Sequence, residues 1–192
     1  MKIGVLALQG DFHEHQVMLE RLGVEVVQVR LPQHLEGLGG LIIPGGESTT
    51  IGKLAVAYGL MEPLRQFGRQ HAVWGTCAGA IFLSNDVHRD QPLLGLMSIE
   101  VERNAFGRQV DSFEADLPVS FLCQDDSPVP PFHAVFIRAP LIETVGDEAR
   151  PLVTLPDGRI VAAQQGHLLA TSFHPELTGD DRFHRYFMGL VK

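Results

Sequence analysis

The chain carries the segment Val73-Trp74-Gly75-Thr76-Cys77-Ala78-Gly79-Ala80, in which one cysteine stands between two glycines. This G-x-C-x-G pattern is the thiol form of the G-x-S-x-G nucleophile elbow, a sharp turn from a strand into a helix. The glycines have a steric role, because side chains two residues from the strained nucleophile would clash. The pattern therefore predicts a strand before Cys77 and a helix, Ala80 to Ser84, after it.

The position of Cys77 at the start of a helix favours nucleophilic chemistry. The helix dipole and the free amides of the first turn favour a thiolate, and the amide of Ala78 would face negative charge that develops on a substrate. A buried structural cysteine in a glycine-rich turn fits the same letters, and short motifs have many false positives. The elbow alone leaves both interpretations open.

The composition is that of an ordinary globular protein. The chain has 192 residues, 45% hydrophobic and 20% charged, so we expect one domain over residues 1–192. A net charge of -8 without a basic cluster argues against nucleic acid as a partner. Two cysteines make neither a disulfide framework nor a metal cluster, and an unpaired reactive thiol suits the reducing cytoplasm. We expect no signal peptide and no membrane, since no apolar run approaches the ~20 residues of a membrane helix.

The part of the chain before Cys77 alternates between short apolar runs and segments with helical spacing. The runs predict strands at Lys2 to Leu8, Val24 to Val29, Leu41 to Ile43 and Ala72 to Trp74. The helical segments are Phe12 to Leu22, Thr49 to Gly59 and Met61 to Gln70. This alternation predicts an α/β fold, a three-layer, open, mostly parallel and flavodoxin-like sheet with helices on both faces. Sites in such sheets lie at the carboxyl ends of strands, where Gln9-Gly10, Gly45-Gly46 and Cys77 fall.

After Leu93 the pattern changes to strands joined by turns. Met97 to Arg103, Val110 to Leu117 and Val119 to Leu122 are expected to be antiparallel additions at one side of the sheet. Gln124 to Pro131 is predicted to be a surface loop. The remaining elements are a strand at His133 to Arg138, a hairpin of Leu152 to Leu155 with Ile160 to Gln164, a last strand at Leu168 to Phe173 and a helix at Asp180 to Val191, with Asp180-Asp181 as its capping charge.

The last strand is followed by a second group of polar residues, His174-Pro175-Glu176. Residues two apart in an extended chain face the same way, and Pro175 biases His174 away from helix. We therefore expect the carboxylate of Glu176 to hold the His174 imidazole in the tautomer that removes a thiol proton. The segment alone fits a polar loop equally well, but together with Cys77 it predicts a cysteine-nucleophile acyl transfer enzyme.

These two groups resemble the class I (triad) glutamine amidotransferases. Within that superfamily, four further segments resemble one family, the glutaminase subunit of pyridoxal 5'-phosphate synthase: Gly4 to Gly10, Pro44 to Thr50, Val101 to Glu114 and Phe136 to Pro140. The resemblance covers nearly the whole chain, and Val101 to Glu114 is its most specific part. Two departures are Ala105, where the family usually has Ser, and a longer loop at Gln124 to Phe132; neither touches the expected catalytic residues.

The resemblance implies hydrolysis of L-glutamine to L-glutamate and ammonia, with no cofactor and no metal. Cys77 would attack the amide carbon, His174 would move the protons and Glu176 would orient His174. The oxyanion would lie between the amides of Gly46 and Ala78. The Gly45-Gly46 peptide is free to turn, so we expect a nearly idle free subunit. Substrate contacts would fall on Gly45, Gly46, Glu47, Arg103, Ile137 and Arg138, although the two arginines also fit surface ion pairs with Glu102 and Glu143.

The implied partner is a (β/α)8-barrel synthase subunit, in a hetero-oligomeric complex that receives ammonia directly. Gln9 and the helix from Phe12 are expected to form part of the docking face. Three alternatives stay open: a glutaminase for another acceptor, against which Val101 to Glu114 argues; a thiol hydrolase on the same fold, which commonly has His where Ala78 stands; and a subunit that only binds. The other eight histidines lack metal-ligand spacing and are expected to be surface or structural residues, and Cys123 a small apolar one.

Overall fold

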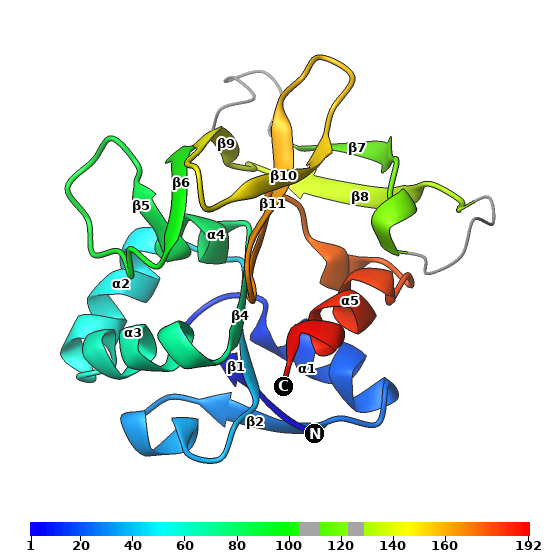
Figure 1. The fold of residues 1–192 in the computed structure, drawn as a ribbon. Coiled ribbons are helices and arrows are strands. Elements are labelled where there is room, and N and C mark those ends of the chain that lie inside the picture. Colours follow the sequence, from blue (N-terminus) through cyan, green and yellow to red (C-terminus); the bar gives the residue numbers. More distant parts are fainter. Residues whose placement is uncertain (104–111, 123–128) are drawn as a thin grey trace.

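A computed structural model describes residues 1–103, 112–122 and 129–192 (Figure 1). Several predictions from the sequence therefore fall outside the described residues. These are the centre of the family-specific segment with its Ala105, the residue Cys123 and most of the predicted loop that follows it.

Within the described residues, a ten-stranded sheet has the order β2-β1-β3-β4-β12-β11-β9-β6-β5, with β10 paired to β11. One half is parallel and consists of β2 (Glu25–Val29), β1 (Lys2–Leu6), β3 (Gly40–Ile43), β4 (Ala72–Thr76) and β12 (Leu168–Thr171). The other half is mixed and consists of β11 (Ile160–Gln165), β10 (Arg150–Thr154), β9 (Leu141–Val145), β6 (Met97–Glu102) and β5 (Ser84–Asp86).

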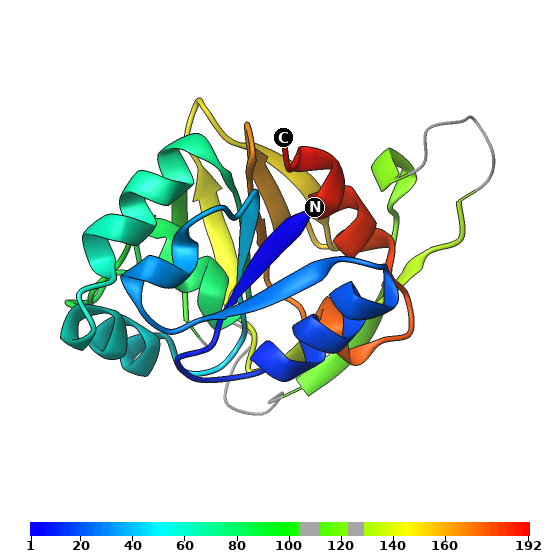
Figure 2. The same ribbon diagram turned by 90° about the horizontal axis from the view of Figure 1, so that it is seen from below.

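Helices cover both faces of this sheet (Figures 1 and 2). One face carries α1 (Phe12–Arg21) and α5 (Arg182–Leu190), which bury side chains such as Leu19 and Phe187 against Trp74. The other face carries α2 (Ser48–Ala57), α3 (Met61–Gln70) and α4 (Ala78–Leu83), which bury Ile51, Leu64 and Phe82 in a separate core. The predicted three-layer α/β fold is confirmed, with the helix of the elbow beginning at Ala78 instead of Ala80.

One strand that was expected to extend the main sheet belongs to a small separate sheet. Among the described residues, the strands β7 (Ser112–Leu117) and β8 (Phe132–Ile137) pair with each other alone, antiparallel. The expectation that Val110 to Leu117 extends the main sheet is therefore wrong for its described part. The reason is packing, because β8 turns Phe132 and Phe136 onto Phe173. The small sheet thereby lies on the side of the main sheet that carries α1 and α5 (Figures 1 and 2).

The predicted strand at Val119 to Leu122 is also wrong. This segment is a helical turn, η2 (Ser120–Leu122), in which the Leu122 amide donates to the Val119 carbonyl at 2.9 Å. The turn directs Phe121 edge-on against Tyr186 of α5, with ring centroids 5.2 Å apart. Packing against the helix thus overrides the strand propensity of the apolar run.

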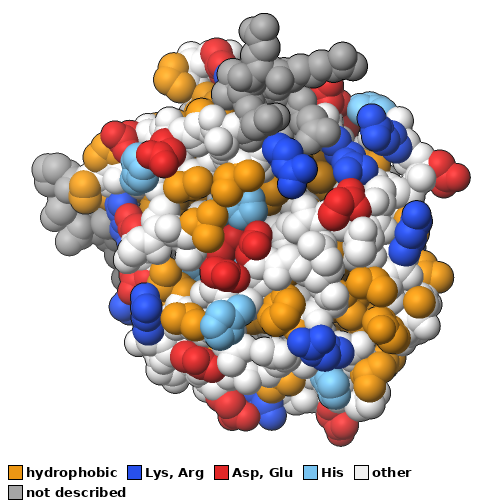
Figure 3. Space-filling view, turned by 180° about the vertical axis from the view of Figure 1, so that it is seen from behind, with side chains coloured by type: hydrophobic (Ala, Val, Ile, Leu, Met, Phe, Trp, Pro, Cys, Tyr) orange, Lys and Arg blue, Asp and Glu red, His pale blue; other side chains and the backbone are white. Residues whose placement is uncertain are grey.

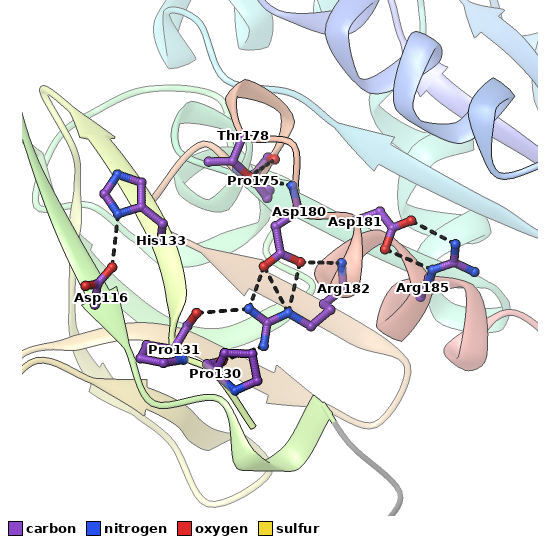
Figure 4. Close-up of polar contacts among 10 residues, drawn as sticks. All are labelled: Asp116, Pro130, Pro131, His133, Pro175, Thr178, Asp180, Asp181, Arg182 and Arg185. Atoms are coloured by element: carbon purple, nitrogen blue, oxygen red, sulfur yellow. Dashed lines mark hydrogen bonds and ion pairs between the residues drawn. The ribbon is translucent and has the colours of Figure 1, made fainter. Parts of the chain in front are cut away.

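Charged side chains secure the start of α5 (Figure 4). The Asp180 carboxylate accepts a hydrogen bond from the Arg182 amide at 3.0 Å, so the predicted capping by Asp180 is confirmed. The Arg182 guanidinium also donates to the carbonyl oxygens of Pro130 at 2.7 Å and Pro131 at 3.0 Å. Asp181 is used differently, since its carboxylate pairs with Arg185 one turn further along the helix.

On the face seen in Figure 3, acidic and basic side chains are interspersed with hydrophobic ones. In the described part of the chain, no helix is both long enough and apolar enough to cross a bilayer.

Candidate active site

Cys77 occupies the turn between β4 and α4 and has a strained backbone, with φ 48° and ψ −108°. A Cβ on Gly75 would lie 2.5 Å from the backbone of Gly79, and one on Gly79 would lie 1.9 Å from the carbonyl oxygen of Ile43. The turn is held from the other side, since the Cys77 amide donates to the Thr171 carbonyl of β12 at 2.8 Å. The predicted strand-elbow-helix geometry is therefore confirmed, and both glycines are required by close backbone approach.

His174 lies just beyond the end of β12, the strand that pairs with β4. Its amide donates to the Val135 carbonyl of β8 at 2.9 Å, so the small sheet positions the histidine backbone. Its ring Nδ1 lies 2.7 Å from Oε1 of Glu176, and both side chains are buried. The pairing agrees with the expectation, but the expected extended geometry is wrong. Glu176 belongs to a 3-10 turn, η3 (Pro175–Leu177), which brings its carboxylate back toward the imidazole.

The electrostatics of the site favour a charged imidazole. Burial lowers the pKa of His174, but hydrogen bonds with Cys77 and Glu176 and the negative charges of both outweigh it, and raise the pKa to about 10. Burial raises the pKa of Glu176, and its hydrogen bond with His174 opposes that shift. Because Nδ1 is engaged by the carboxylate, Nε2 is the ring nitrogen left for the thiol. The imidazole thus hydrogen-bonds to the carboxylate and is coupled electrostatically to the sulfur.

A second acid, Asp11, lies at the edge of this site, with Oδ2 3.6 Å from Nδ1 of His174. The ligand atoms of Asp11, His174 and Glu176 lie within 4.8 Å of one another, the kind of grouping that can hold a metal ion. A metal there would take the nitrogen that Glu176 needs to orient the ring. These three residues could therefore serve proton transfer or metal binding, but not both at once.

The turn Gly45-Gly46-Glu47 lies beside the imidazole, because a Cβ on Gly45 would meet Cε1 of His174 at 2.5 Å. Two bonds from the β1-α1 turn hold it: the Asp11 amide donates to the Gly45 carbonyl at 3.1 Å, and the Glu47 amide donates to Oε1 of Gln9 at 2.7 Å. In a trans peptide the Gly46 N–H points opposite to the Gly45 carbonyl, and hence away from the Asp11 amide. Gly46 itself has φ +147°, which favours glycine.

Glu47 and Arg103 form an ion pair next to this turn. Nη2 of Arg103 lies 2.7 Å from Oε1 of Glu47, so the alternative pairing of Arg103 with Glu102 is not what the structure shows. Burial opposes ionisation of Glu47, but hydrogen bonds from Thr49, Thr50 and Arg103 lower its pKa to about 2. The pair offers an anion and a cation side by side, as the two charges of an α-amino acid require.

Ile137 and Arg138 border the site from the end of β8. The Ile137 carbonyl oxygen lies 3.9 Å from Sγ of Cys77. Arg138 follows with an uncommon positive φ of 43° and is exposed. The structure thus brings the predicted residues from five separate segments to one edge of the sheet.

Two histidines also reach this site, although the sequence pattern assigned them no role beyond surface or structure. His15 and His184 are completely buried behind Glu176. The sequence feature that could have indicated burial of His15 is its spacing with Leu19 and Leu22, which places all three on the apolar face of a helix. The divergence of His13 and His15 on that helix is confirmed, since His13 is exposed.

Known proteins place this fold and site in a class and then in a family. A solved structure titled as a glutamine amidotransferase matches with a TM-score of 0.91 and 52% identity over 98% of both chains. The PurLQS structure from Thermotoga maritima, 16% identical with a TM-score of 0.70, shares the fold. The chain is thus an enzyme of the glutamine amidotransferase class. It belongs to the SNO glutamine amidotransferase family, whose model matches residues 5–192.

Curated relatives are similar over their full length. The pyridoxal 5'-phosphate synthase subunit PdxT of Herpetosiphon aurantiacus is 58% identical over 195 residues, covering 99% of this chain and 100% of the relative. The PdxT subunit of Roseiflexus castenholzii is 56% identical over 194 residues with the same coverage. The resemblance inferred from the sequence is therefore confirmed.

Proposed function

We propose that this chain hydrolyses L-glutamine to L-glutamate and ammonia and supplies the ammonia for pyridoxal 5'-phosphate synthesis. The observation that carries the proposal is the hydrogen bond of His174 to Glu176 beyond the end of β12, the strand that pairs with β4, whose end leads into Cys77, with His174 coupled electrostatically to Cys77. The PdxT relatives, named as subunits of a pyridoxal 5'-phosphate synthase, support the pathway. A cytoplasmic location and a single domain over residues 1–192 are part of this proposal.

The chemistry is a two-step acyl transfer. The Cys77 thiolate attacks the amide carbon, and the oxyanion is bound by the amides of Ala78, where α4 begins, and Gly46. The His174 imidazolium donates its proton to the departing ammonia, leaving a thioester on Cys77. His174 then takes a proton from water, which attacks the thioester. The Cys77 thiolate leaves, glutamate loses its carboxylic proton to solvent, and the thiolate and imidazolium that begin the cycle are restored.

Glutamine is selected by its two charged ends. Glu47 faces the α-ammonium group, Arg103 faces the α-carboxylate, and the backbone at Gly45, Gly46 and Ile137 lines the side-chain amide, with Arg138 at the rim. Ammonia is a small neutral molecule that water protonates, so the product passes directly to a (β/α)8-barrel synthase subunit in a hetero-oligomeric complex. The position of α1 beside the site supports docking there.

Release of glutamate from glutamine, measured with and without the barrel subunit, tests this function. We expect the barrel subunit to raise the rate, and Cys77→Ala to lower it by more than about 10³-fold, because the nucleophile is lost. Ser84→Ala at the start of β5, a residue outside the site, is the control and should keep the activity. Glutamate release by Cys77→Ala at the wild-type rate would exclude the thioester route, and release without pyridoxal 5'-phosphate formation by the complex would favour another acceptor pathway.

A further inference from the structure

Three buried polar side chains lie behind the carboxylate of Glu176. They come from separate elements: His15 from α1, Thr76 from the end of β4 and His184 from α5. All three are completely buried. Buried polar groups cost free energy unless they are hydrogen-bonded, so their arrangement must satisfy one another.

The distances connect these side chains into a row. Nε2 of His184 lies 3.0 Å from Nδ1 of His15. On the opposite edge of the ring, Nε2 of His15 lies 3.2 Å from Oγ1 of Thr76 and 3.3 Å from Oε2 of Glu176. Oε1 of that carboxylate is used by His174 at 2.7 Å. Among the described residues, His15 is the ring that reaches the second carboxylate oxygen.

The protons in this row can be assigned by counting donors. Burial, followed by the nearby charges of His184 and His174, lowers the pKa of His15 well below its ordinary value, so its ring is neutral and has one N–H. If that proton were on Nδ1, His15 would donate to Nε2 of His184, and the proton of His184 would lie on its Nδ1, a buried atom that meets no partner in the described structure. Oε2 of Glu176 would then face the lone pair of His15 Nε2. With the proton on Nε2, His15 donates to Oγ1 of Thr76 and accepts from Nε2–H of His184, and its N–H faces Oε2 of Glu176 at 3.3 Å, close enough for an ion-pair contact although no hydrogen bond to Oε2 is formed.

We propose that His15 is a positioning residue for the catalytic carboxylate: its Nε2–H donates to Oγ1 of Thr76 and directs its positive end at Oε2 of Glu176 3.3 Å away, and its Nδ1 accepts a hydrogen bond from His184. This inference rests on the proposed function for its catalytic consequence. The row fixes the carboxylate so that Oε1 stays aimed at His174. It also stabilises the ionised form of Glu176, which in turn stabilises the imidazolium.

The charged and titratable groups that face this system come from every element packed around it. They are Cys77 and Asp11 beside His174, Glu176 between the rings, and His15 and His184 behind, with Asp181 acting on His184. Since the acids and Cys77 are unchanged in a His15 variant, a shift in the titration of His174 reports the loss of the His15 donor.

The first experiment uses the unaltered full chain with ¹⁵N-labelled histidine. Nitrogen chemical shifts distinguish a protonated ring nitrogen from a bare one, and the proposal requires neutral His15 and His184, each protonated at Nε2. A His15 ring protonated at Nδ1 overturns the proposal. This measurement needs neither catalysis nor a variant, so it stays decisive if the chain proves to have no glutaminase activity or a variant fails to fold.

The second experiment compares His15→Leu with His15→Gln, whose amide nitrogen can donate from the same side. In His15→Leu we expect the pKa of His174 to fall by about one unit and kcat for glutamate release to fall about tenfold, with KM unchanged. In His15→Gln, the pKa of His174 and kcat should both return most of the way to their wild-type values. The control is His167→Leu, which removes another ring hydrogen bond, 2.9 Å to the Gly68 carbonyl, at the opposite end of β12.

The two proposals fail in different ways. If wild-type complex releases no glutamate, the proposed function is wrong while the ring assignment still stands or falls by its nitrogen shifts. If the complex is active but folded His15→Leu keeps the wild-type kcat and His174 titration, His15 has no positioning role.

Discussion

Gly79 shows at the level of one residue how the elbow depends on a missing side chain. Any Cβ at this position would run into the carbonyl oxygen of Ile43, which is backbone and cannot rotate away. The close contact between α4 and β3 is what keeps Cys77 at the sheet edge. A change here therefore acts on the fold and the site together.

Gly79→Ala should lower the free energy of unfolding by about 1–3 kcal/mol or more, because the backbone must shift to admit the methyl group. The matched control is Gly189→Ala within α5, where a Cβ meets nothing within 4 Å and alanine favours helix, so a gain of up to about 1 kcal/mol is expected. Urea denaturation measures both. Equal effects at the two positions would contradict the steric argument.

Arg103 is the residue whose charge should decide glutamine affinity. Arg103→Met should raise KM for glutamine about 10- to 100-fold and change kcat little, since the lost contact serves substrate and transition state alike. Arg69→Met on the exposed surface of α3 is the control, because Arg69 lies away from the site and shares the charge change. Steady-state kinetics of the complex give both constants. An unchanged KM in Arg103→Met would show that the ion pair of Arg103 with Glu47 is structural and does not bind glutamine.

At the scale of elements, the β1-α1 turn holds the turn Gly45-Gly46-Glu47 through two hydrogen bonds. The Asp11 amide holds the Gly45 carbonyl, and Gln9 holds the Glu47 amide. Turning the Gly45-Gly46 peptide over would break the first of these bonds. Because α1 follows the β1-α1 turn directly, the docking proposed at α1 would act on the orientation of the Gly46 amide through these two hydrogen bonds.

Gln9→Ala tests this connection. We expect stimulation of glutaminase activity by the barrel subunit to fall about tenfold, the effect of losing one hydrogen bond that fixes the turn. Gln66→Ala, an exposed glutamine on α3, should leave the stimulation unchanged. Activity is measured at saturating partner, and hydrogen exchange of the Gly46 amide is followed in parallel. Full stimulation of Gln9→Ala, or identical Gly46 exchange in free and bound chains, would refute this connection.

At the scale of the whole molecule, two separate cores lie on the two faces of one sheet. The buried rings of His15 and His184 pack edge-on against Trp74 of one of them. Burial lowers the pKa of His184 to about 4, while in the unfolded chain it is near 6.5. Between these values the unfolded chain binds a proton that the folded chain does not. This difference stabilises the unfolded state as pH falls from 6.5 to 4.

The free energy of unfolding should therefore decrease on acidification through this range, with His184 contributing on the order of 3 kcal/mol by pH 4. The raised pKa of Glu176 acts in the opposite direction and offsets part of the loss. His184→Phe should flatten the pH dependence, whereas His13→Gln on the exposed face of α1 should not. Urea denaturation at pH 7, 6 and 5 provides the comparison, and parallel slopes for His184→Phe and wild type would show that His184 does not contribute.

Local patterns predicted most of the elements but not how the second half assembles. The elbow, the two helices separated at Gly59 and the hairpin at residues 150–165 follow from glycine positions and from hydrophobic periodicity, which are properties of neighbouring residues. The short apolar runs at Val110 to Leu117 and Val119 to Leu122 were ambiguous for the same reason. Their structure depends on contacts with Phe173 and with α5, which lie far along the chain.

The amino-acid sequence by itself determined the α/β class, the family and the residues expected to form the triad, because these depend on short motifs and local periodicity. Only the tertiary structure decided that Glu176 reaches His174 through a 3-10 turn, that Arg103 pairs with Glu47, and that His15 lies behind the carboxylate. His15 is 61 residues from Thr76 and 169 from His184 in the chain. No local pattern encodes such a meeting, since it arises when α1 and α5 pack on the same face of the sheet and exclude water from the groups between them.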